Sequence, residues 1–230
     1  DSVTNEAFCM ALARRMKLRV ADTQILMAAD QRILLVRRYD RRRADDGAWS
    51  RLHQEDFCQA LGVPPDLKYQ NEGGPDLQAC FSLLRRATRP SAPEVIRLLD
   101  AVTFNALIGN HDAHAKNFSI LYQQQRGVLA PLYDLLCTAV YPTLTDKMAM
   151  KVGSKYRFNE VQVRHWEQLA KAAGLSGAQT KKRVAGIAKR LPSCARGLQT
   201  EALYSGQPLV ERIISLIEQR CALTLERLNT

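Results

Sequence analysis

Residues 107–120 constrain the fold of this chain most, because an apolar helical run and an apolar β-like run meet there across a polar break. The helical run stops at Gly109, and Asp112 and Asn117 lie inside the break. A second carboxylate, Asp134, follows further on, directly after a second apolar segment. The pattern predicts a polar loop between a helix and a β-hairpin, with Asp134 just beyond the hairpin.

Three of these side chains suit phosphoryl transfer, which needs an oriented hydroxyl and a firm hold on the phosphates and their metal. Asp112 can accept the hydroxyl proton, and Lys116 is close enough in sequence to reach the transferring phosphate. The oxygens of Asn117 and Asp134 are ligands that Mg²⁺ prefers. Protein kinases use this order of Asp, Asn and distant Asp. The alternative is a set of ordinary turn residues, since Asp and Asn are common in turns.

Two histidines, His111 and His114, flank Asp112. A zinc site would need further ligands at paired spacing, and Cys137 is the one other soft candidate near them. We therefore expect the histidines to order the loop by hydrogen bonding.

Composition sets broad limits on the class of protein. The chain has 230 residues, 46% of them hydrophobic, and a net charge of +10. It holds no apolar run long enough to span a bilayer, and we expect no membrane contact. Its six cysteines lack metal spacing, which favours buried, reduced thiols in a cytoplasmic protein. The positive charge suggests an anionic partner, and the basic run at residues 37–43 is either a solvated face or a nucleic-acid contact.

Periodicity predicts a mainly α fold with short β-hairpins, in the α+β class. Hairpins are expected over 20–36 and 118–130, with Arg126 and Gly127 near the tip of the second. The expected helices cover residues 2–17, 53–61, 76–87, 93–108, 160–173, 177–190, 194–204 and 207–227.

Several segments in the right order resemble the HipA toxin kinases. The resemblance is strongest in residues 104–119 (FNALIGNHDAHAKNFS) and 129–136 (LAPLYDLL). It extends to residues 1–6 (DSVTNE), 36–42 (VRRYDRR), 54–59 (QEDFCQ) and 68–75 (KYQNEGGP). It is close up to about residue 150 and loose by pattern in the helical tail.

The resemblance implies a serine/threonine kinase that uses ATP and Mg²⁺. Residues 41–230 would form a helical, kinase-like C-lobe, preceded by an N-lobe remnant of helix, hairpin and hinge at residues 1–40. Kinases of this family phosphorylate an aminoacyl-tRNA synthetase, often the glutamyl one. A HipB-like DNA-binding antitoxin pairs with them, which gives DNA contact through the complex.

The resemblance also implies individual roles. Asp112 would be the catalytic base, with Lys116 beside it, and Asn117 and Asp134 would bind Mg²⁺. The nucleotide would contact residues spread over the chain: Glu6 on the first helix, Tyr39 at the hinge, His114, Tyr133 and Asp134. Arg37 stands where the family often has Glu, which leaves the contacts to the adenine edge open.

The phosphate-covering loop, the strand Lys and the regulatory Ser of the family precede the matched segments, and this sequence starts at Asp1. Three explanations compete: a fragment of a longer kinase, a subunit completed by another polypeptide, or a pseudokinase. We favour the fragment. The alternative function is a non-catalytic module that binds an antitoxin or an acidic protein, and direct nucleic-acid binding through residues 37–43 is a third.

Overall fold

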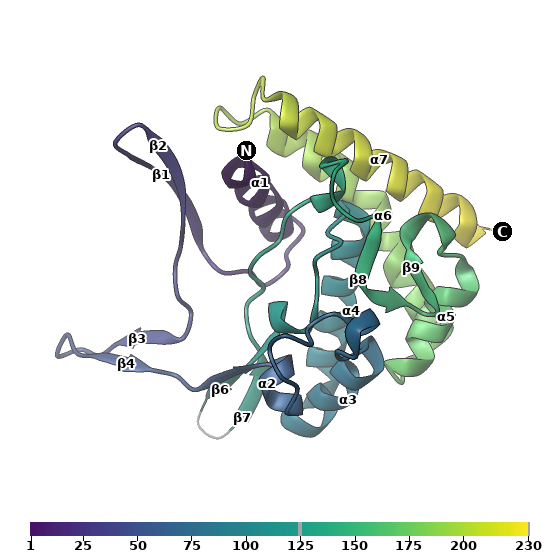
Figure 1. Cartoon of the computed structure of the whole chain (residues 1–230), viewed down its shortest axis with the longest axis horizontal. Helices are drawn as coiled ribbons and strands as arrows, with labels where there is room; N and C mark the ends of the chain where they lie inside the picture. Colours follow the sequence, from purple (N-terminus) through teal and green to yellow (C-terminus); the bar gives the residue numbers. More distant parts are fainter. Residues whose placement is uncertain (124–125, 230) are drawn as a thin grey trace.

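A computed structural model describes residues 1–123 and 126–229. Figure 1 shows the helices packed into one body, with two β-hairpins projecting away from it on one side. Within these residues the α-helices are α1 (Ser2–Arg15), α2 (Phe57–Leu61), α3 (Leu77–Ala87), α4 (Ser91–Ile108), α5 (Val163–Ala172), α6 (Gly177–Gln199) and α7 (Pro208–Asn229). The expected mainly α fold with short hairpins is confirmed.

The strands pair into small antiparallel sheets. They are β1 (Thr23–Ala28), β2 (Gln31–Val36), β3 (Arg41–Arg43), β4 (Trp49–Arg51), β5 (Gln54–Asp56), β6 (Ser119–Gln123), β7 (Arg126–Leu129), β8 (Lys147–Val152) and β9 (Lys155–Arg157). β1 pairs with β2, β3 with β4 and β8 with β9, and β5, β6 and β7 form a three-stranded sheet. Both expected hairpins are present. Arg126 and Gly127 begin β7, and residues 124–125 lie outside the described residues.

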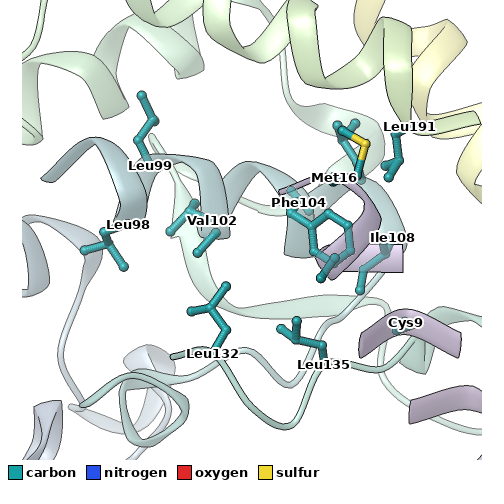
Figure 2. Close-up of a cluster of buried hydrophobic side chains, with 14 of the residues drawn as sticks. Cys9, Met16, Leu98, Leu99, Val102, Phe104, Ile108, Leu132, Leu135 and Leu191 are labelled. Carbon is teal, nitrogen blue, oxygen red and sulfur yellow. The ribbon is translucent and has the colours of Figure 1, made fainter. Parts of the chain in front are cut away.

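Helix α4 lies at the centre of the core, where it packs against α3, α6 and α7. Its predicted apolar stripe is buried throughout: Val95, Leu98, Leu99, Val102, Leu107 and Ile108. Figure 2 shows Val102 and Phe104 of this helix on the side that faces Leu132 and Leu135, with Leu99 pointing away from them. The buried helix therefore places its C-terminal end, where the polar loop starts, on a rigid base.

Helix α1 begins at its N-cap Asp1, whose side chain accepts a hydrogen bond from the Thr4 amide. Its buried Asn5 is paired in both directions with the backbone of Cys137. The Asn5 Nδ2 donates to the Cys137 carbonyl at 2.9 Å, and the Cys137 amide donates to Oδ1 at 2.7 Å. This pair of hydrogen bonds fixes α1 against the segment that follows Asp134.

The helix boundaries predicted between residues 177 and 204 are wrong. The expected breaks around Pro192 do not occur, and α6 runs unbroken from Gly177 to Gln199. Leu191, Ala195 and Leu198 continue the buried stripe through the proline, so packing outweighs the lost backbone hydrogen bond.

The helix expected over 53–61 is also shorter than predicted. Residues Gln54–Asp56 form β5, which pairs with β6, and the helix begins only at Phe57. Asp56 caps it by accepting from the Gln59 amide at 2.9 Å. Propensity alone could not reveal a partner strand that lies more than sixty residues further along the chain.

Two further hairpins have no counterpart in the predicted elements. The β3–β4 hairpin consists largely of exposed arginine, with Arg41 opposite Arg51 and Arg43 opposite Trp49. The β8–β9 hairpin turns at Gly153, whose φ of 60° suits glycine. Neither shows the polar and apolar alternation by which strands are recognised.

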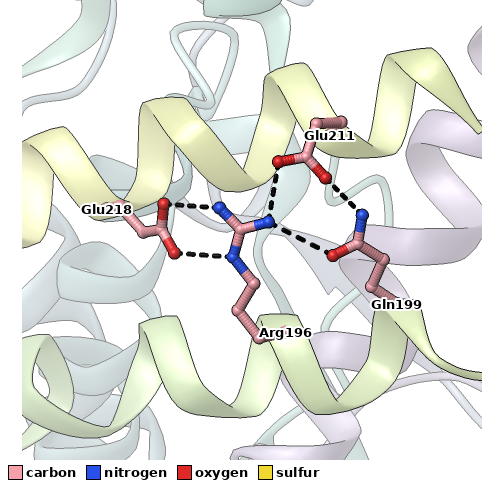
Figure 3. A network of polar contacts seen from close by, with 4 residues as sticks. All are labelled: Arg196, Gln199, Glu211 and Glu218. Atoms are coloured by element: carbon pink, nitrogen blue, oxygen red, sulfur yellow. Dashed lines mark hydrogen bonds and ion pairs between the residues drawn. The ribbon is translucent and has the colours of Figure 1, made fainter.

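Helices α6 and α7 are joined on their outer side by a polar network (Figure 3). Arg196 donates to both carboxylate oxygens of Glu218 at 2.7 Å and to Glu211 at 2.7 Å. Gln199 completes the network by donating to Glu211. These side chains are solvent-exposed, so the network orients the two helices more than it stabilises them.

Among the residues that the structure describes, none of the helices combines the length and the apolar character needed to cross a bilayer.

Candidate functional site

The polar loop starts where α4 ends at Gly109, which has a φ of 78°. Its amide closes the helix on the Asn105 carbonyl. A Cβ atom at this position would lie 2.8 Å from the Cβ of Ala139 and 2.9 Å from the Cδ2 of Leu216. Both the backbone conformation and the space therefore require glycine.

Replacing Gly109 with alanine is expected to destabilise the protein by about 2 kcal/mol, because the left-handed conformation and the close contacts both add strain. Urea unfolding of the variant measures this loss. Gly62→Ala provides the matched control, because Gly62 also has a positive φ but its Cβ would meet nothing within 4 Å. Equal losses in the two variants would contradict the steric part of the argument.

Asn110 is the hub from which the loop is built. Its side chain donates to Asn105 Oδ1 at 2.9 Å and to the Asp134 carbonyl at 3.4 Å, while its Oδ1 accepts from the Asp112 amide at 3.2 Å. It is buried. Sequence reasoning missed this residue, although an Asn directly after a helix-ending Gly is a recognisable signal.

The structure brings together the three residues predicted for base and metal chemistry. The side-chain Nδ2 of Asn117 donates to Oδ2 of Asp134, and its Oδ1 accepts from the backbone amide of His114 at 3.1 Å. Asp112 is near enough for its charge to raise the pKa of Asp134. Asp134 itself has a φ of 56°, a left-handed conformation that is costly for a residue with a Cβ and typical of functional positions.

The electrostatics of this cluster favour a bound cation. Burial raises the pKa of Asp134, and the nearby Asp112 raises it further. Burial, with the charge of Asp134, raises the pKa of Glu6 to about 7. Carboxylates that are desolvated and repel one another are relieved by a divalent cation, and the oxygens of Asn117 and Asp134 suit Mg²⁺. The residue types thus suit the predicted metal, although Asn117 here turns its Nδ2 and not its Oδ1 toward Asp134.

The two tyrosines predicted near the nucleotide lie against each other. The rings of Tyr39 and Tyr133 are stacked, with centroids 6.2 Å apart. The Tyr133 hydroxyl donates to the Lys116 carbonyl at 2.7 Å and lies 2.8 Å from the Ser119 hydroxyl. Tyr133 therefore ties the strand after the loop to the loop itself.

Lys116 is half-buried, and within the described part of the chain its ammonium has no ion pair. Its positive charge opposes the rise that burial causes in the pKa of the Cys58 thiol, which indicates that the two side chains lie near each other. Its amine is therefore available to an anionic group that the structure does not contain.

The two histidines differ. His111 is buried and bridges segments: its amide donates to the Thr138 hydroxyl at 2.7 Å, its Nδ1 lies 2.9 Å from the Thr145 carbonyl, and Arg220 lies 3.3 Å from its Nε2. Burial lowers its pKa, so the neutral ring donates from Nδ1. This agrees with the loop-ordering role expected from the sequence.

His114 lies closer to the carboxylates. Burial lowers its pKa, against the opposing charge of Asp112. Its buried Nδ1 has no hydrogen-bond partner among the described residues. The ring of Tyr69 meets it edge-on, with centroids 5.4 Å apart.

Sequence reasoning also missed Tyr69, whose hydroxyl donates to Oδ1 of Asp112 at 2.7 Å. Tyr69 and Asp112 line a cavity of about 380 Å³. A larger cavity of about 680 Å³ lies elsewhere, between the end of α1, α4 and α6. We assign the acceptor side of the chemistry to the smaller one because Asp112 forms part of its wall, whereas no residue of the loop cluster lines the larger one.

The basic run at residues 37–43 is largely solvent-exposed. Arg38 forms two hydrogen bonds to the buried carboxylate of Asp40, at 2.8 and 2.6 Å, and these bonds hold the pKa of Asp40 below its usual value. Arg41 and Arg51 lie 3.9 and 3.7 Å from the same carboxylate. Part of the positive charge in this run is thus neutralised internally.

Comparisons with known proteins place this geometry in a family. The HipA-like C-terminal domain matches residues 1–195. The putative kinase Y4mE of Sinorhizobium fredii is 49% identical over 183 residues, which cover 80% of this chain and 44% of that protein. The serine/threonine-protein kinase toxin HipA of Shewanella oneidensis is 28% identical over 202 residues, which cover 83% of this chain and 46% of the toxin. The chain thus spans about half the length of these relatives.

Solved structures agree. HipA of Shewanella oneidensis, in its complex with HipB and operator DNA, superimposes with a TM-score of 0.84 at 25% identity, over 99% of this chain and 55% of that one. The Helicobacter pylori kinase CtkA has a TM-score of 0.66 at 12% identity, over 99% of this chain and 83% of that one, which concerns the fold alone. The fold is therefore protein-kinase-like, and the chain belongs to the HipA-like C-terminal domain family.

Proposed function

We propose that this chain carries the catalytic base and metal ligands of an ATP- and Mg²⁺-dependent serine/threonine protein kinase of the HipA toxin type. The observation that carries the proposal is the convergence of Asp112, Asn117 and Asp134 in one loop cluster. Its kinase-named relatives and kinase-like fold support it.

In this proposal Asp112 accepts the proton of the acceptor hydroxyl as the phosphoryl group is transferred. Asn117 and Asp134 would hold Mg²⁺, which when bound neutralises charge on the phosphates. The Lys116 ammonium adds positive charge at the transferring phosphate. Little covalent chemistry is required, because orientation and charge stabilisation supply most of the rate.

The nucleotide would be held by residues around this cluster. In this proposal the stacked pair of Tyr39 and Tyr133 would face the adenine, and His114 would add a further contact to the nucleotide. Glu6 belongs on the phosphate side, because the Asp134 charge acts on it. On this assignment residues 1–40 are the N-lobe part and residues 41–230 the C-lobe.

We extend the proposal to partners of the same class as those of the relatives. The HipA of Shewanella oneidensis was solved with HipB and operator DNA, which supports a HipB-like antitoxin and DNA contact through that complex. The proposed substrate is an aminoacyl-tRNA synthetase, such as the glutamyl one, and the proposed site of action is the cytoplasm.

Calorimetry of ATP binding in the presence of Mg²⁺ tests the metal assignment in the full-length gene product. Asp134→Asn keeps the shape of the side chain but removes its charge, and we expect it to weaken binding by about tenfold or more. Asp30→Asn is the matched control, because Asp30 is an exposed turn residue away from the site. Equal binding by wild type and Asp134→Asn would show that the metal assignment is wrong. No binding by the wild type would favour the non-catalytic interaction module.

A further inference from the structure

Tyr69 lies on the proposed catalytic base although the two residues are 43 positions apart in the sequence. Its hydroxyl donates to Oδ1 of Asp112 at 2.7 Å. Burial raises the pKa of the phenol, and the bond to the Asp112 carboxylate raises it further. The phenol therefore stays protonated at neutral pH and remains a donor to Asp112.

A hydroxyl at this distance from Asp112 is the feature that the acceptor of the reaction must provide. A general base takes a proton across a contact of roughly 2.6–3.2 Å between heavy atoms. The hydroxyl of a serine or threonine therefore needs a hydrogen-bonding position on Asp112, and the Tyr69 hydroxyl occupies one at Oδ1. Tyr69 thus resembles a bound acceptor in the one contact that matters for proton transfer.

The loop that carries Tyr69 is anchored next to that residue, so displacing the hydroxyl requires the side chain to move and not the loop. The side chain of Gln70 accepts from the Lys151 amide at 2.8 Å, which joins the loop to β8. Gly74 lets the loop fold onto itself, because a Cβ there would lie 2.4 Å from the Leu67 carbonyl. Tyr69 itself is only partly buried, so its side chain can leave Asp112 without opening the core.

The ring contacts of Tyr69 do not depend on its hydroxyl. Its ring meets His114 edge-on, and the Lys68 ammonium lies 5.0 Å from the ring centroid. Both contacts are available to phenylalanine as well. The hydroxyl and the ring can therefore be separated by a single substitution.

The cavity beside this contact offers room for an acceptor segment. Its volume is about 380 Å³, and Asp112 and Tyr69 form part of its wall. Glu72, Lys147 and the exposed Leu144 also line it. Such a surface, with an apolar contact and charges of both signs, suits an extended polypeptide segment more than a small rigid molecule.

We propose that the Tyr69 hydroxyl holds the place of the acceptor at Asp112, and that a serine- or threonine-bearing segment binds in this cavity by displacing it. The inference rests on the proposed kinase function and adds one condition to it: an acceptor hydroxyl that approaches Oδ1 of Asp112 must compete with Tyr69. A hydroxyl group that binds too weakly to displace Tyr69 is therefore not phosphorylated.

Tyr69→Phe in the full-length gene product tests this competition, with dephosphorylated casein as the acceptor probe. We expect the KM for casein to fall about tenfold while kcat stays within about twofold, because a hydrogen bond to a charged group no longer has to be broken. Tyr122→Phe is the matched control. Tyr122 donates to Glu55 at 2.7 Å, an equally short bond to a carboxylate outside the loop cluster, and its loss should leave both constants unchanged.

An unchanged KM in Tyr69→Phe would overturn the proposal. A lower kcat at unchanged KM would also overturn it, because the hydroxyl would then help to position Asp112. The proposal is also overturned if the wild type and Tyr69→Phe both bind Mg²⁺ and ATP but neither transfers phosphate to casein. If the wild type fails to bind the nucleotide at all, the proposed kinase function is wrong and the competition falls with it.

Discussion

Asp112→Asn is expected to lower the kcat of phosphoryl transfer by about 10²- to 10⁴-fold, the usual contribution of a general base. The amide has the shape of the carboxylate and still accepts the bond from Tyr69, but it takes up no proton. ATP affinity in the presence of Mg²⁺ should stay near the wild-type value, because in the proposal Asp112 holds the acceptor hydroxyl and is not a metal ligand. Single-turnover transfer of labelled phosphate to casein, beside calorimetry of ATP binding, measures both quantities.

Asp30→Asn again serves as the control, since its side chain is exposed on the β1–β2 turn. Turnover of Asp112→Asn within about threefold of the wild type would remove Asp112 from the role of base. A parallel loss of transfer and of ATP binding would instead indicate that Asp112 belongs to the metal site. These two outcomes distinguish a role of Asp112 as the base from a role as a metal ligand, and its position in the loop alone cannot make that distinction.

The loop cluster was predictable because its information is local. Gly109 ends a helix, and Asp112 and Asn117 follow at a fixed spacing before a hairpin, so residue types and order suffice. In the structure Asp134 lies beside them, since the hairpin between them folds back by neighbouring-strand pairing. Short-range patterns of this kind survive folding because the chain has few other ways to arrange them.

The rest of the site depends on contacts between distant segments, and the sequence pattern holds no record of them. Tyr69 reaches Asp112 only because the α2–α3 loop packs on β8, and nothing in its own neighbourhood indicates that contact. The same reason explains why β5 was missed: its three residues become a strand only when β6 lies beside them. Pro192 shows the opposite case, in which a strong local breaker yields to a buried helix face.

Glu6 illustrates how the arrangement of distant elements sets a chemical property. Its neighbour Asn5 is bonded to Cys137, three residues after Asp134, and this attachment brings the Glu6 carboxyl into the field of Asp134. Burial is the larger cause of its raised pKa, and the carboxylate is the second. A group with a pKa of about 7 changes its charge within the physiological pH range, so the free energy of unfolding must depend on pH over that range.

Glu6→Gln is therefore expected to stabilise the protein at pH 8 by about 3 kcal/mol and at pH 5 by only about 1 kcal/mol. The pKa of Glu6 is about 7 in the folded state against an ordinary value of 4.5, so the folded state binds the proton more tightly than the unfolded chain. Stability from this group is present below pH 4.5 and is lost as the pH rises to about 7. Glutamine does not ionise and loses nothing over that interval. Urea unfolding at the two pH values measures the difference.

Glu167→Gln is the matched control, because Glu167 is exposed on α5 and its substitution should give no difference between the two pH values. A Glu6→Gln variant that is less stable than the wild type at pH 8 would show that the Glu6 carboxylate is ionised and paired in the fold. Millimolar Mg²⁺ sharpens the comparison. If the cation binds beside Asp134, it offsets the repulsion on Glu6, and the advantage of the variant at pH 8 should shrink while that at pH 5 stays the same.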